Sequence, residues 1–263
     1  MKLKLTKTLY EKQGRVGIVK FNQPAKLNSI DDIVLEELAA ILEEAEQDPE
    51  IGCIVLTGEG PKAFSAGGDI GEEIKKGSLE GYDFVLGFTR VNYLIEHARM
   101  PVIAAINGWC LGGGTEISLA CDIRIAAENA KMGSPEVNLG LMPGVGGTTR
   151  LPRIIGESKA KIWVFTGNKY TAQQCLELGV VDMVVPADKL MDEAVALAEQ
   201  LAEKPPLAIK YLKANIHEGL QIDLDRALRM EGFTNALLFG TADKYEAMLA
   251  FMEKREHKPW MGK

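Results

Sequence analysis

Short apolar runs alternate with glycine- and proline-containing turns up to about residue 187. Several of these runs are apolar throughout, which is typical of strands buried on both faces of a sheet. Strand and helix signals recur at intervals of roughly forty to fifty residues. This recurrence predicts repeated β–β–α units in an α/β fold, although no letter-by-letter repeat is visible. Strands are expected at residues 15–21, 51–57, 102–106, 123–127 and 180–185.

Helical periodicity follows several of these strands. Ser29, with Asp32 three positions later, resembles a capping box, and an apolar face continues from there to residue 47. Residues 71–87 are polar with weak periodicity, so we expect a partly mobile segment there and a helix from about 88 to 98. The first helix should bury Ile33, Leu35, Leu38, Ile41, Leu42 and Ala45; shorter helices are expected at 159–166 and 171–178.

From residue 188 onward the pattern changes to helical stripes without a strand signal. Helices are expected within 190–201 and at 207–218, 223–238 and 243–256, and Pro205-Pro206 separates the first from the rest. A helical tail with many apolar positions, on a chain that already carries a core, indicates an oligomerisation element. We therefore expect a β–β–α core with the site in residues 1–200 and a helical C-terminal region in residues 201–263.

Composition narrows the class of protein. The 263 residues are 46% hydrophobic and 25% charged, as in ordinary soluble globular proteins. A net charge of −7 gives no indication of nucleic-acid binding, and no apolar run approaches the ~18 residues of a membrane-spanning helix. The basic N-terminal residues precede no continuous apolar segment, so no signal peptide is expected.

Cysteine and histidine usage points away from disulfides and metals. The four cysteines share no CxxC spacing, and three of them lie in apolar strand or helix contexts, as buried small hydrophobic residues do. We expect a reduced, cytoplasmic protein. The three histidines are scattered, so we expect no metal site. The cysteines are Cys53, Cys110, Cys121 and Cys175, and the histidines are His97, His217 and His257.

The chemically most informative stretch is residues 107–116, where Gly112, Gly113 and Gly114 stand between a strand and a helix and Glu116 follows. The first N–H groups of a helix have no partner within it, and glycines let a ligand approach them closely. The helix dipole adds partial positive charge at the same place. The stretch therefore predicts a site for a developing anion with a carboxylate beside it.

Other functions of glycine-rich loops find no support. Neither this loop nor the small-residue loop at 62–70 matches the phosphate-binding pattern GxxxxGK[ST] or a GxGxxG dinucleotide fingerprint. Ser65 is not surrounded by the GxSxG pattern of serine hydrolases.

Four motifs together resemble the crotonase (enoyl-CoA hydratase/isomerase) superfamily. They are Lys-Ala-Phe-Ser-Ala-Gly-Gly-Asp-Ile at 62–70, the stretch 105–116, Gly-Ser-Pro-Glu at 133–136, and Pro-Gly-Val-Gly-Gly-Thr-Thr-Arg-Leu at 143–151. The resemblance runs from about residue 16 to 256. It implies a crotonase-type spiral of ββα units, a C-terminal helical trimerisation region, and a homotrimer or a homohexamer built as a dimer of trimers.

The resemblance also implies a reaction and its residues. Family members bind acyl-CoA thioesters and hold the thioester oxygen between two backbone N–H groups, which fall here on Gly68 and Gly113. Hydratases of the family carry two glutamates at the positions of Glu116 and Glu136. By resemblance, Glu136 is the proton donor to Cα and Glu116 the base that orients water, while the N–H of Gly144 lies near that water. Two adjacent carboxyls also separate each other's pKa values.

Contacts with the CoA part of the substrate are implied in the same way, with no cofactor beyond that CoA. Phe251 and Lys254 match a C-terminal segment that reaches a neighbour's CoA. Two departures concern the acyl pocket: Gly68 stands where many hydratases have alanine, and Thr149 where glutamine is common. The CoA nucleotide is expected near Ala25, Lys26 and Leu27, and the pantetheine path along Ala66, Asp69 and Ile70.

Alternatives remain open. A single glutamate is most often a solvated surface charge, and Glu136 after Pro135 could be a helix-capping acid. Within the family, a double-bond isomerase or a hydratase of a cyclic or dienoyl-CoA fits the same motifs. A crotonase-fold protein that binds acyl-CoA without catalysis is disfavoured because both glutamates are present.

Overall fold

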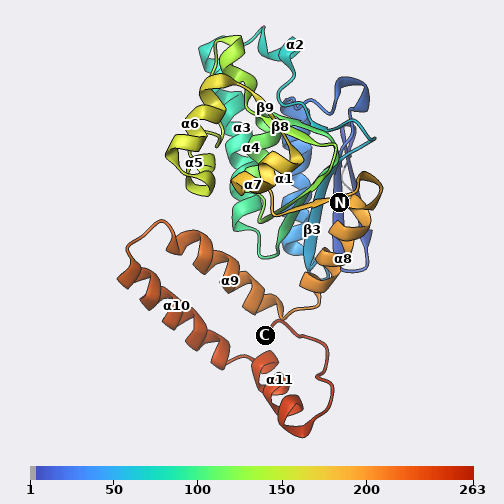
Figure 1. Cartoon of the computed structure of the whole chain (residues 1–263). Helices are drawn as coiled ribbons and strands as arrows, with labels where there is room; N and C mark the ends of the chain where they lie inside the picture. The colour runs from blue at the N-terminus through green and yellow to red at the C-terminus, as the bar shows by residue number, and fades with distance from the viewer. Residues whose placement is uncertain (1–3) are drawn as a thin grey trace.

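The computed structural model describes residues 4–263 and contains a six-stranded sheet in the order β1-β2-β3-β5-β7-β10 (Figure 1). All neighbours pair in parallel except β1, which runs antiparallel to β2. Every residue of β3 and β5 is buried, because helices cover both faces of the sheet at its centre. The strands are β1 (Thr8–Gln13), β2 (Val16–Phe21), β3 (Cys53–Gly58), β5 (Val102–Ile106), β7 (Ile123–Ala127) and β10 (Met183–Val185).

A second sheet has the order β4-β6-β8-β9, with only β8 and β9 antiparallel. Three times the chain passes from a strand of the first sheet to a short strand of the second and then to helices, as β3–β4, β5–β6 and β7–β8. This confirms the expected ββα units. The strands are β4 (Ala63–Ser65), β6 (Trp109–Leu111), β8 (Lys131–Gly133) and β9 (Lys169–Thr171).

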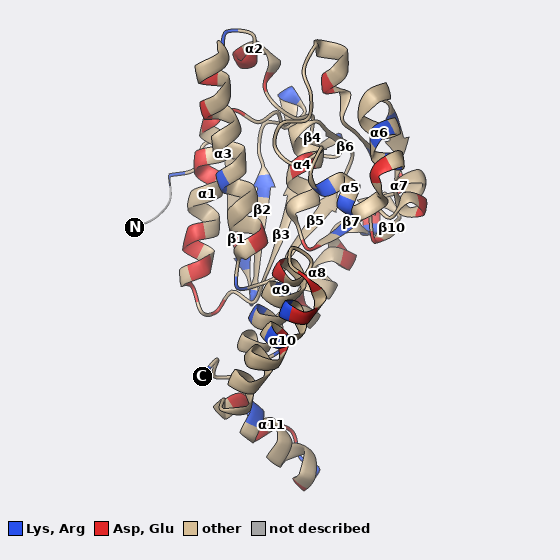
Figure 2. Ribbon diagram, turned by 90° about the vertical axis from the view of Figure 1, so that its left-hand side faces the viewer, with Lys and Arg blue, Asp and Glu red and all other residues tan. Residues whose placement is uncertain are grey.

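Helices enclose the sheets, with α1 packed beside α3 and α8 lying against β3 and β5. Charged positions gather on these outer helices, whereas β3 and β5 carry none (Figure 2). The elements are η1 (Pro24–Lys26), α1 (Asp32–Gln47), α2 (Ile70–Glu73), α3 (Ser78–His97), α4 (Gly113–Ala120), η2 (Pro135–Leu139), α5 (Arg150–Ile155), α6 (Glu157–Thr166), α7 (Ala172–Leu178), η3 (Ala187–Lys189) and α8 (Leu190–Ala202).

The expected capping box at Ser29 is wrong. Asp31 caps α1 instead, and its Oδ1 accepts a hydrogen bond from the N–H of Val34 at 3.1 Å. The reason is tertiary: Ile30 forms a β-bridge with Gly68, and its N–H donates to the carbonyl of Gly67, so Ile30 does not enter the helix. The helix therefore starts later, and Val34 is buried while Ile33 is 45% exposed.

The segment 71–87, expected to be irregular and partly mobile, is helical over most of its length. The helix α3 begins at Ser78, ten residues before the expected start. Its core contact is a narrow stripe of Phe84, Phe88, Val91 and Ile95, spaced for a helix but sparse enough to hide among polar neighbours. Edge strand β1 was not predicted either, since most of its residues are exposed or half-buried.

Three helices follow α8 and extend away from the sheets (Figures 1 and 2). The Nζ of Lys213 fastens α9 to the core through the carbonyls of Ile95 and Met100 and the carboxylate of Asp122, at 2.7, 3.1 and 2.7 Å. None of the helices within residues 4–263 combines the length and the apolar character that a membrane-spanning helix needs. The helices are α9 (Pro206–Gly219), α10 (Leu224–Phe239) and α11 (Ala242–Glu253), close to the expected bounds.

Candidate active site

A cavity of about 600 Å³ lies where the glycine-rich loops, α2, α3 and η2 meet. It brings together both predicted glutamates and both predicted backbone donors, although these come from segments far apart in the chain. Apolar side chains of α3 and of the loop after η2 form much of its remaining wall. Predicted residues that line it are Ala66, Gly68, Ile70, Gly113, Glu116, Glu136 and Gly144.

The loop that follows η2 holds the carboxylate of Glu116 in place. Its Oε1 accepts hydrogen bonds from the N–H groups of Val145 and Gly147, at 2.9 and 2.7 Å. The side chain is only 2% exposed, and burial raises its pKa, while the two N–H donors act in the opposite direction. With Oε1 fixed in this way, Oε2 is the oxygen left for a ligand.

Glu136 has no such support. Both of its carboxyl oxygens are buried, and neither has a hydrogen-bond partner among the residues described. Burial raises the pKa of Glu136 to about 7, and the nearby carboxylates of Glu116 and Glu73 act in the same direction. A buried polar group without a partner is unfavourable by ~1–3 kcal/mol or more. The arrangement is therefore one that a bound ligand or water completes, and Glu136 is not a helix-capping surface acid.

The two glycine loops approach each other closely beside these carboxyls. Gly67 has φ +92°, and a Cβ there would lie 3.2 Å from the N of Gly113 and 2.8 Å from the carbonyl oxygen of Leu111. Within residues 4–263, no acceptor takes the N–H of Gly68 or of Gly113. Gly113 is the first residue of α4, so its N–H points out of the helix start. Two unpaired N–H groups thus border the cavity.

Sequence reasoning missed the residues that hold the loop under Glu116. Arg150 forms a two-pronged ion pair with Glu96, at 2.5 and 2.6 Å, and donates to the carbonyl of Val145 at 3.0 Å. Asn92 donates to the same carbonyl at 2.7 Å. The conspicuous glycines at 144, 146 and 147 marked the loop, and Arg150 lies in the same motif, but Asn92 and Glu96 lie over fifty residues away on α3 and carry no local signal.

The expected CoA-binding residues lie around a smaller hollow and the start of α2. Ala25 and Leu27 line this hollow, which has a volume of about 280 Å³. It lies next to the 62–70 loop, which also borders the large cavity. Lys26 instead pairs with Asp69 at 2.7 Å. The Asp69 carboxylate also caps α2 by accepting from the N–H of Gly71 at 3.0 Å, so its contacts are with the protein.

Phe251 and Lys254 are not brought to this cavity. They lie at the end of α11, at the opposite end of the protomer from α2 (Figure 1), and Phe251 is 84% exposed. Any contact of these residues with a CoA molecule would have to be made on another copy of the chain.

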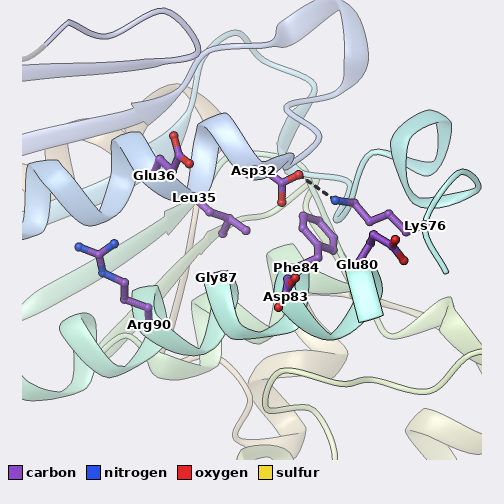
Figure 3. A pocket seen from close by; sticks show the side chains of 9 residues that line it. All are labelled: Asp32, Leu35, Glu36, Lys76, Glu80, Asp83, Phe84, Gly87 and Arg90. Atoms are coloured by element: carbon purple, nitrogen blue, oxygen red, sulfur yellow. Dashed lines mark hydrogen bonds and ion pairs between the residues drawn. The ribbon is translucent and has the colours of Figure 1, made fainter. Parts of the chain in front are cut away.

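A second hollow of about 450 Å³ lies between α1 and α3, behind Phe84 (Figure 3). Lys76 crosses its edge, pairs with Asp32 at 2.7 Å, and lies 4.8 Å above the centre of the Phe84 ring. Phe84 and Lys76 also line the large cavity. The side chains of Phe84 and Lys76 thus separate this hollow from the large cavity.

Comparison with known proteins gives a consistent result. Residues 11–263 match the profile of the enoyl-CoA hydratase/isomerase family. The chain is 41% identical over 254 residues to the short-chain-enoyl-CoA hydratase of Clostridium acetobutylicum, with 97% of both chains covered. It is 39% identical to the crotonyl-CoA hydratase of Syntrophomonas wolfei, over 94% of this chain and 95% of the other.

Solved structures agree in fold. A crystal structure of an enoyl-CoA hydratase from Bacillus anthracis superposes with a TM-score of 0.95 at 38% identity, covering 98% of this chain and 100% of that one. A match over almost the whole chain, in sequence and in structure, leaves no large segment unaccounted for. The chain belongs to the enoyl-CoA hydratase/isomerase family.

Proposed function

We propose that this protein catalyses the reversible hydration of a 2-enoyl-CoA thioester to a 3-hydroxyacyl-CoA. The observation that carries the proposal is the pairing, in one cavity, of two buried carboxyls with two unpaired backbone N–H groups. The similarity to relatives named short-chain-enoyl-CoA and crotonyl-CoA hydratase supports the same activity. The enzyme is accordingly a hydro-lyase.

In the proposed reaction the thioester oxygen accepts hydrogen bonds from the N–H groups of Gly68 and Gly113. These hydrogen bonds strengthen as the thioester oxygen becomes enolate-like. One such donor typically lowers the activation barrier by about 2.7–4 kcal/mol. They are part of the main chain and so need no reorganisation during the step. The start of α4 adds its dipole to the same oxygen.

Glu116 and Glu136 divide the proton transfers. Oε2 of Glu116 takes a proton from water as the water oxygen bonds to Cβ, and Glu136 delivers its proton to Cα. The N–H groups of Val145 and Gly147 orient Glu116 and act against the rise in its pKa that burial causes. Glu136 starts protonated because its raised pKa favours the neutral form. The N–H of Gly144, on the cavity wall, is the proposed donor to the water.

The CoA moiety is the only cofactor-like group in this proposal. Its nucleotide end is assigned to the hollow at Ala25 and Leu27, and its pantetheine to the path past Ala66 and Ile70. Lys26 and Asp69 contribute by fastening these two segments to each other. Four free, buried cysteines fit a reducing compartment, and we place the enzyme in the cytoplasm.

We further propose that α9–α11 build a homotrimer, or a homohexamer of two trimers. The projecting helices expose many large apolar side chains, as helices at an interaction surface do. Native mass spectrometry should give three or six times the protomer mass of 28.7 kDa, whereas a monomer at micromolar concentration would contradict the assignment. Leu212, Ile216, Leu220, Leu224, Leu228, Phe233, Leu237 and Phe251 are among the exposed residues.

A crotonyl-CoA assay tests the activity. Adding the enzyme should remove the absorbance of the conjugated double bond. A double-bond isomerase, the family alternative, would instead create that absorbance from a 3-enoyl-CoA, and a non-catalytic acyl-CoA-binding protein would do neither. A panel of linear, dienoyl and cyclic enoyl-CoA thioesters then identifies the acyl group.

A further inference from the structure

A third carboxyl, that of Glu73, enters the cavity beside Gly68. Glu73 is the last residue of α2 and one of the lining residues. A Cβ on residue 68 would lie only 1.7 Å from the Glu73 Oε1 and 2.8 Å from its carboxyl carbon. The absence of a side chain at Gly68 is therefore what allows Glu73 to occupy this position. Alanine there would displace the carboxyl.

Glu73 has no protein partner within residues 4–263, since no hydrogen bond or ion pair reaches its carboxyl oxygens. Lys76, three residues further on, is the nearest candidate, but its Nζ is engaged by Asp32 and by the Phe84 ring (Figure 3). Burial raises the pKa of Glu73, and the charge of Asp69 adds to this, while Lys76 acts in the opposite direction. Its neighbour Glu72 contrasts with it: it is exposed and pairs with Lys75 at 3.0 Å.

The wall around Glu73 is mostly apolar. Phe84, Val85 and Phe88 of α3 and Met142 of the following loop line the same space. A half-buried carboxyl in such surroundings is unfavourable unless something hydrogen-bonds to it. No residue within 4–263 supplies such a group, so the donor is solvent in the free enzyme and the ligand once the cavity is filled.

We propose that Glu73 is a specificity-determining residue that accepts a hydrogen bond from a hydroxyl group on the acyl chain of the substrate. This inference rests on the proposed hydratase function and names the class of acyl group. The enzyme then prefers a hydroxylated 2-enoyl-CoA to the plain alkyl compound of the same length.

The surroundings of Glu73 favour a neutral donor. The wall is mostly apolar, so burying an ammonium there would cost more desolvation than burying a hydroxyl. The carboxylate of Glu116 disfavours an acyl group that bears a carboxylate of its own. A hydroxyl meets neither penalty, and it can donate to Glu73 whether that carboxyl is ionised or protonated.

The test compares kcat/KM for (E)-2-hexenoyl-CoA with kcat/KM for its 4-, 5- and 6-hydroxy derivatives. For at least one derivative, wild type should prefer the hydroxylated substrate by ~10- to 100-fold, the range of one hydrogen bond to a charged or polar acceptor. Glu73→Met should reverse the preference, while Glu73→Gln should retain part of it through its amide oxygen. Gly68→Ala should lower the ratio of kcat/KM for the hydroxylated substrate to kcat/KM for hexenoyl-CoA, because its Cβ displaces Glu73.

Glu72→Met is the matched control, because it removes a carboxylate from the same short helix but outside the cavity; it should leave the ratio unchanged. A wild-type ratio at or below one for all three derivatives would overturn the proposal, as would an unaltered ratio in both Glu73→Met and Gly68→Ala. If hexenoyl-CoA is hydrated but the ratio fails, only this inference falls. If no enoyl-CoA is hydrated, the proposed function falls. The affinities of hexanoyl-CoA and its hydroxy derivatives, measured by calorimetry, then test the preference for a hydroxyl without turnover.

Discussion

Glu116 and Glu136 face the same cavity, yet Glu116 is hydrogen-bonded to the loop beneath it while Glu136 has no partner within residues 4–263. The difference separates their chemistry. A carboxyl fixed by two N–H donors is stabilised as the anion, whereas a buried carboxyl without donors favours the protonated form. Burial raises the pKa of both carboxyls, and the two N–H donors oppose that rise at Glu116, so we propose that the pair starts with Glu116 as base and Glu136 as acid, as water addition requires.

The pH dependence of hydration should reflect this division. Because Glu136 must carry its proton to protonate Cα, kcat/KM for hydration should fall above pH about 7, the pKa to which burial raises this carboxyl. In the reverse direction Glu136 must be ionised and Glu116 must carry the proton, so the pair holds the same number of protons and kcat/KM for dehydration of a 3-hydroxyacyl-CoA should fall with the same profile. Steady-state rates between pH 5 and 9 in both directions check this. A hydration profile that stays flat or rises between pH 7 and 9 would contradict the assignment.

Replacing Glu136 by glutamine should stabilise the free enzyme at high pH. Its raised folded-state pKa means that ionisation opposes folding, so this residue's contribution to stability is present at low pH and lost as pH rises through about 7. Glu136→Gln should therefore melt at a higher temperature than wild type at pH 8, and the difference should shrink at pH 5. Thermal denaturation at both pH values measures it. A lower melting temperature for the variant at pH 8 would show that Glu136 has a partner when folded.

The backbone donor at Gly113 can be tested through Gly67. Gly67→Ala places a Cβ 3.2 Å from the N of Gly113, which shifts that N–H, and kcat should fall by ~10²–10³. The matched control is Gly179→Ala, at φ +82° with nothing within 4 Å of the new Cβ. Both variants share the cost of alanine at positive φ, about 1–2 kcal/mol of stability. Only Gly67→Ala should lose activity; equal kcat values for the two variants would argue against the donor.

Local patterns predicted β2, β3, β5, β7 and β10 because those signals lie within a few residues, whereas the pairing of the two carboxyls followed from the family resemblance. The continuous apolar runs at β3 and β5 indicated buried strands, and the three glycines before Glu116 indicated a close approach at a helix start. The motif at 133–136 placed Glu136 correctly in the cavity.

What the sequence did not predict depends on contacts between distant segments. The start of α1 moved because Ile30 pairs with Gly68, and a β-bridge across 38 positions has no local signature. The support of Glu116 by Arg150, Glu96 and Asn92 arises only when α3 packs beside the 144–147 loop. In the same way Gly68 stood out as a departure from the family pattern, but only the structure shows that Glu73 fills the space it leaves.

We propose that Glu116 and Glu136 together perform hydration. The most direct measurement is the rate of crotonyl-CoA hydration by wild type, Glu116→Gln and Glu136→Gln, alongside calorimetric binding of butyryl-CoA to each. Each variant should bind butyryl-CoA and lose ~10²–10⁴ in kcat, the usual contribution of a general acid or base. Wild-type turnover in both variants would contradict the account.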